Sequence, residues 1–60
     1  MKVRKEIKDF ITANGTSSEA SIIAACVAAG IRQNRVERVL DRLATRGKLI
    51  KVGDDYSFPA

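Results

Sequence analysis

Hydrophobic residues recur at helical spacing in three separate stretches of the chain. The first stretch places four of them on one helical face, at Val3, Ile7, Phe10 and Ile11. This spacing predicts a helix over residues 2–14. We expect it to end at Asn14-Gly15, because both residue types tolerate the left-handed conformation that is common at helix C-termini.

A second helix is expected over residues 18–29. Residues 16–18 are Thr or Ser and can each cap its N-terminus, and Glu19 stands three residues after Thr16, as in a capping box. Gly30 follows at the position where a glycine commonly ends a helix. The apolar face of this helix is expected to consist of Ile22, Ile23, Cys26 and Val27.

The pattern repeats in a third helix, expected over residues 33–46 and closed by Gly47. Its apolar positions are Val36, Val39, Leu40 and Leu43. Residues 48–58 then form two β-prone runs around Gly53-Asp54-Asp55, a composition typical of a hairpin turn. The predicted fold class is therefore α+β and mostly helical, with three helices and a C-terminal two-stranded hairpin.

Sixty residues provide material for a single domain with one small core. We expect all three helices and the hairpin to contribute to this core. Its predicted members are Val3, Ile7, Phe10, Ile11, Ile22, Ile23, Cys26, Val27, Ile31, Val36, Val39, Leu40, Leu43, Leu49, Tyr56 and Phe58.

The composition argues against most catalytic chemistry. The chain has no histidine and one cysteine, Cys26, so it can form no internal disulfide and lacks the common zinc ligand sets. It also lacks the usual general base and leaves little room for a substrate pocket. We expect no enzyme activity, no catalytic residue, no metal, no cofactor and no small-molecule substrate.

Membrane insertion and secretion are also not expected. The longest uncharged stretch, residues 20–31, is far shorter than the roughly 20 residues that a membrane-spanning helix needs. The charged residues at positions 2–9 do not fit the apolar segment of a secretory signal. An intracellular location, in the cytoplasm and nucleoid or in the nucleus, is expected.

Positive charge is concentrated in two segments. The net charge is +4, and residues 31–46 carry five basic and two acidic side chains, while residues 1–15 carry four basic and two acidic ones. This distribution favours a polyanionic partner such as nucleic acid. The alternative is a solvated basic surface that keeps the protein soluble.

The residues around the second and third helices resemble the winged helix-turn-helix superfamily. The motif has a small residue in its first helix and a glycine in its turn, which Cys26 and Gly30 match. It then has an apolar residue after the glycine and a β-branched core residue in the second helix, which Ile31 and Val36 match. The later run of Leu40, Leu43, Gly47, Leu49 and Tyr56 resembles a third helix leading into the wing. Within the superfamily, the chain is similar to the C-terminal winged helix of archaeal replicative helicases.

A second similarity, in Arg46-Gly47-Lys48-Leu49, is to Zα domains, which bind left-handed nucleic acid. The Zα signature residues are absent, however. Glu37 and Asp41 occupy the positions of the Zα asparagine and tyrosine, and the chain contains no tryptophan.

The resemblance implies that the third helix is a recognition helix that enters the major groove of DNA. Asn34 and Arg38 are then expected to contact base edges. Arg35, Arg42 and Arg46 are expected to hold phosphates, with Lys48 and Lys51 of the first wing strand beside them. Asp41 also faces outward and would repel phosphate unless Arg38 neutralises it. The acidic wing tip, Asp54-Asp55, is not expected to enter the minor groove.

The sequence thus leads to two hypotheses of function. The first is a double-stranded DNA-binding winged helix that acts as a small regulator of transcription or replication. The second is a protein-interaction module of a larger nucleic-acid-processing assembly. The small residues Ala24, Ala25 and Ala28 of the second helix would suit a homodimer or protein contact, or else close packing inside the domain.

Overall fold

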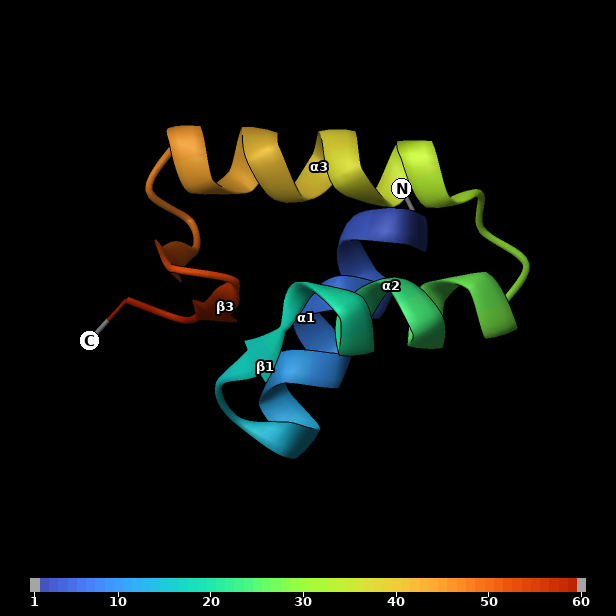
Figure 1. Cartoon of the computed structure of the whole chain (residues 1–60), viewed down its shortest axis with the longest axis horizontal. Coiled ribbons are helices and arrows are strands. Elements are labelled where there is room, and N and C mark those ends of the chain that lie inside the picture. The colour runs from blue at the N-terminus through green and yellow to red at the C-terminus, as the bar shows by residue number, and fades with distance from the viewer. Residues whose placement is uncertain (1, 60) are drawn as a thin grey trace.

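The computed structural model describes residues 2–59 and contains three helices and a small antiparallel sheet (Figure 1). The elements in chain order are α1 (Lys2–Asn14), β1 (Ser17–Ser18), α2 (Glu19–Ala28), α3 (Gln33–Thr45), β2 (Ile50–Val52) and β3 (Asp55–Ser57). The three helices lie where the hydrophobic spacing predicts them, and the mostly helical α+β class is confirmed. In Figure 1, α3 lies along one side of the molecule, with α1 and α2 beneath it.

Both α2 and α3 end in the same hydrogen-bonded motif. After α2, the N–H of Ile31 donates to the carbonyl of Cys26 at 3.0 Å, and the N–H of Gly30 donates to Val27 at 2.9 Å. This is the Schellman pattern, which requires a left-handed residue, and Gly30 provides it with φ of 88°. The four residues between α2 and α3 therefore form a tight turn.

The sheet has three strands in the order β1-β3-β2, so the predicted two-stranded hairpin was incomplete. The hairpin itself is present, but Asp55, predicted in its turn, is the first residue of β3 and pairs with Val52. Strand β3 also pairs with β1, where Ser17 lies opposite Tyr56. In addition, the N–H of Glu19 donates to the carbonyl of Asp54 at 2.7 Å. The hairpin is thus attached to the start of α2.

The capping box predicted from Thr16 is wrong. Ser18 caps α2 instead, because its hydroxyl accepts a hydrogen bond from the N–H of Ser21 at 3.2 Å. The carboxylate of Glu19 accepts a hydrogen bond from the Tyr56 hydroxyl at 3.3 Å. Residues 17–18 are extended because they pair with β3, which places the cap two residues later than Thr16.

The core contains ten buried hydrophobic residues from all three helices and the hairpin. They are Val3, Ile7, Ile11, Ile22, Cys26, Val36, Leu40, Leu43, Leu49 and Tyr56. Four other predicted members are half-buried against this cluster, namely Phe10, Ile23, Ile31 and Val39.

Two predicted core residues are exposed. Val27 is 49% exposed, because only a narrow arc of α2 around Ile22 and Cys26 faces the other helices. Phe58 is 39% exposed, because β3 ends at Ser57 and the alternation of faces stops where strand pairing stops. Apolar residues occur on several sides of α2, so the sequence pattern alone does not show which of them face the core.

Two buried side chains have altered ionisation. Burial raises the pKa of the Cys26 thiol, and the negative charge of Glu6 adds to this effect. Burial likewise raises the pKa of the Tyr56 hydroxyl, with a further contribution from Glu19. Both groups are therefore neutral at physiological pH. Cys26 is a poor nucleophile, and its buried side chain is part of the core.

Candidate nucleic-acid interface

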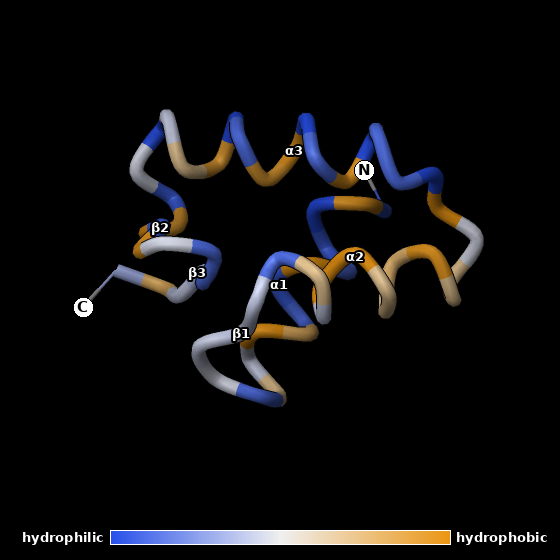
Figure 2. Tube along the Cα trace, in the orientation of Figure 1, coloured by the Kyte–Doolittle hydropathy of each residue, from blue (hydrophilic) through white to orange (hydrophobic). Residues whose placement is uncertain are grey.

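Helix α3 is sharply divided between a buried and an exposed side. Val36, Leu40 and Leu43 face the core, and Figure 2 shows the hydrophobic positions of α3 turned toward the rest of the molecule. The seven residues predicted to contact DNA are all exposed: Asn34, Arg35, Arg38, Arg42, Arg46, Lys48 and Lys51. Exposure makes all of them accessible to a ligand.

The arginines of α3 are not engaged by carboxylates. Within residues 2–59 the one ion pair joins Lys5 to Asp9, with 3.6 Å between Nζ and Oδ2. Arg38 does not form an ion pair with Asp41, so it does not neutralise this carboxylate by direct contact. The Glu37 carboxylate instead accepts a hydrogen bond from the Gln33 amide at 3.0 Å. The guanidinium groups of α3 thus keep their hydrogen-bonding capacity.

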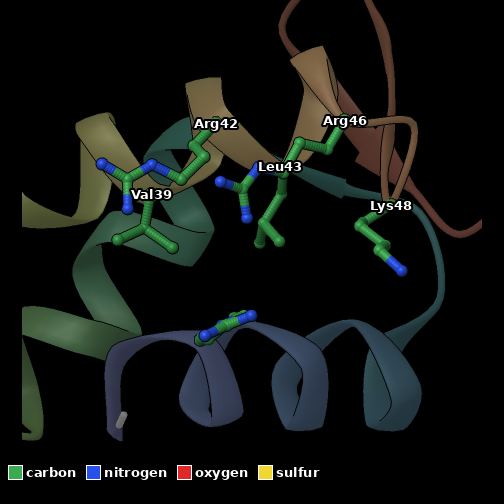
Figure 3. A pocket seen from close by; sticks show the side chains of 6 residues that line it. Val39, Arg42, Leu43, Arg46 and Lys48 are labelled. Carbon is green, nitrogen blue, oxygen red and sulfur yellow. The ribbon is translucent and has the colours of Figure 1, made fainter.

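Three of the predicted residues meet at a hollow between α1 and α3. Arg42, Arg46 and Lys48 line it (Figure 3). Arg4 of α1 also belongs to the lining. Its volume is about 50 Å³. Val39 and Leu43 form its apolar lining and point from α3 toward α1 in Figure 3.

A second hollow of about 120 Å³ adjoins the first along the same two helices. The two hollows share Arg4, Leu43 and Lys48, so they form one groove. Lys8 and Leu49 complete the lining of the second hollow. We call this the α1–α3 groove, and its lining consists of Arg4, Lys8, Val39, Arg42, Leu43, Arg46, Lys48 and Leu49.

The end of α3 explains how Lys48 comes to lie beside the last helical turn. The N–H of Lys48 donates to the carbonyl of Leu43 at 2.9 Å, and the N–H of Gly47 donates to Ala44 at 3.1 Å. This second Schellman motif folds the chain back onto the last turn of the helix. Arg46, the C-cap residue, and Lys48 are thereby held next to Arg42.

Other predicted residues lie apart from the groove. Arg35 lines a separate hollow at the opposite end of α3, together with Lys2 and Arg32. Lys51 lies opposite Tyr56 in the sheet, with its ammonium 5.8 Å from the centre of the Tyr56 ring. That contact has cation–π geometry. Lys51 is thus not among the described residues that line the groove.

The sequence-based site did not include Arg4 and Lys8. These residues are four apart on α1 and share the flank of the helix that meets α3. The helical spacing places them together, but it does not show which flank of α1 would lie against α3. That information comes only from the packing of the helices.

No protein-family model matches the chain, and comparisons with curated proteins and with solved structures also found no match. Among residues 2–59, no helix has the length and apolar character needed to cross a membrane. Nor does this part of the chain bring together three or more residues of the types that commonly bind metal ions.

Proposed function

We propose that this chain is a winged helix-turn-helix protein that binds double-stranded DNA, as a small regulator of transcription or replication. Several features of the fold support the proposal. The turn between α2 and α3 is four residues long and contains a glycine, as in helix-turn-helix motifs. The hairpin that follows α3 is in the position of a wing.

The observation that carries this proposal is the row of exposed, unpaired arginines on α3. An anionic partner accounts for their presence, because Arg38 with Arg42 and Arg42 with Arg46 are like-charged pairs four residues apart, which destabilise an isolated helix. The 13 residues of α3 make a rod of about 20 Å. A helix of this size fits into the major groove of B-DNA.

Within this proposal the exposed residues have different roles. Asn34 and Arg38, on the outward side of α3, contact base edges. Arg42 and Arg46 hold phosphates and carry no sequence information. The hairpin tip at Asp54 is acidic, so it stays outside the minor groove.

A second candidate function, protein interaction, is supported by a different surface. A shallow hollow on α2 is lined by Ala20, Ile23, Ala24, Val27 and Ala28, together with Glu19 and Gln33. Of the alanines predicted for a partner contact, Ala24 and Ala28 are exposed and Ala25 is half-buried. This surface shares no lining residue with the α1–α3 groove.

A map of backbone amide chemical shifts during titration with random-sequence duplex DNA tests the proposal. The largest changes are expected in residues 33–46, with smaller ones at Lys48. Residues 20–28 of α2 should change little and provide the internal control. Changes confined to α2 or to the hairpin, or no changes at low ionic strength, would refute DNA binding by α3.

A further inference from the structure

The α1–α3 groove has two cationic walls and an apolar floor. Arg4 and Lys8 stand on the α1 side, and the opposite wall is formed by Arg42, Arg46 and Lys48. The floor consists of Leu43 and Leu49, which are almost fully buried, and the half-buried Val39. Among residues 2–59, no acidic residue lines either hollow of the groove, and Asp9 borders a neighbouring hollow with Arg4, Lys5 and Lys8.

Helix-dipole interactions stabilise the cations of only one of these walls. Arg42 and Arg46 lie at the C-terminal end of α3, where the helix dipole favours cations. Arg4 lies in the first turn of α1, where the dipole disfavours them. Within residues 2–59, Arg4 forms no ion pair, whereas its neighbour Lys5 pairs with Asp9. The cations of the α1 wall therefore add repulsion, and an anion between the walls would relieve it.

We propose that the α1–α3 groove binds the sugar–phosphate backbone of one DNA strand, and that α1 is thus a second DNA-binding element. This inference rests on the DNA-binding function proposed above. Phosphates contact the cations on both walls. A chain of regularly spaced anions matches a groove with cations on both sides.

The position of the groove is suited to this role. When a helix fills the major groove, the two backbones of the duplex run along its two sides. The side of α3 toward α1 carries the cations Arg42 and Arg46. The acidic Glu37 instead accepts a hydrogen bond from Gln33, which borders the hollow on α2. The backbone on the α1 side of α3 therefore meets more positive charge than the backbone on the α2 side.

Two adjacent residues of α1 provide a matched test. Arg4→Gln and Lys5→Gln each remove one positive charge from the same turn of α1, but only Arg4 lines the 50 Å³ hollow of the groove. Binding of a fluorescein-labelled random-sequence duplex is measured by anisotropy at several salt concentrations. Arg4→Gln is expected to weaken binding roughly tenfold at 0.1 M salt and to flatten the plot of log affinity against log salt by about 0.9. Lys5→Gln should change the affinity by less than about twofold.

Further variants separate charge from structure. Arg4→Lys keeps the charge and should restore the slope of the wild-type protein, while circular dichroism should show the same helix content in every variant. Equal effects of Arg4→Gln and Lys5→Gln, with binding still weakened by Arg42→Gln, would overturn the role of α1 and leave DNA binding by α3 intact. If the wild-type protein shows no salt-dependent binding, both proposals are refuted.

Discussion

Replacing Leu40 with alanine is expected to leave the protein largely unfolded at room temperature. Leu40 is fully buried in α3 against the other helices and the hairpin. Truncation of a buried leucine costs about 2–5 kcal/mol of unfolding free energy. A domain of this size has only about 3–5 kcal/mol in total. Far-UV circular dichroism during thermal unfolding should show no cooperative transition above 25 °C.

Val52→Ala is the matched control for this experiment. Val52 is 70% exposed on the hairpin, so its truncation leaves no cavity and should change stability by less than about 0.5 kcal/mol. A Leu40→Ala variant that melts cooperatively near the temperature of the wild-type protein would contradict the packing of α3 described above.

Replacing the three arginines of α3 and the C-cap Arg46 with glutamine is expected to cause the largest loss of DNA binding. The variant changes Arg35, Arg38, Arg42 and Arg46. Removing three phosphate contacts and the base contact of Arg38 should weaken duplex binding by roughly a thousandfold at 0.1 M salt, because fewer counterions are released and one base is no longer contacted. The fold should persist, since all four residues are exposed and glutamine is a good helix former. Anisotropy titrations and circular dichroism measure the two quantities separately.

The hairpin tip provides the control for this variant. Asp54→Asn with Asp55→Asn also changes the net charge, but it does so on the hairpin and removes no cation. We expect its affinity for duplex DNA to be unchanged or slightly higher. Near-wild-type binding by the four-arginine variant would show that α3 is not the DNA-binding surface.

The helices could be predicted from the sequence because their hydrophobic spacing and glycine stops are local signals. Gly30 and Gly47 ended α2 and α3 as predicted, since each provides the left-handed residue of a Schellman motif. Strand β1 could not be predicted in this way. Serine is a common helix-capping residue, so Ser17 and Ser18 predict a cap and not a strand. They are extended because they pair with β3.

The candidate site was predictable on α3 and not on α1. The arginines of α3 share one helix, so the helical repeat alone places Arg42 beside Arg46. Arg4 joins them from the other end of the sequence, through the packing of α1 against α3. The position of Lys51 also depends on tertiary structure, because the sheet register places it opposite Tyr56.

The affinity of the wild-type protein for duplex DNA as a function of salt concentration tests the proposed function most directly. Each phosphate neutralised by a cation releases counterions, so five or more contacts predict a slope of log affinity against log salt of about −4.5 or steeper. A protein-interaction module without phosphate contacts has no such counterions to release. Salt-dependent binding with that slope is the result we expect, and a slope near zero, or no binding at 50 mM salt, would contradict DNA binding by this chain.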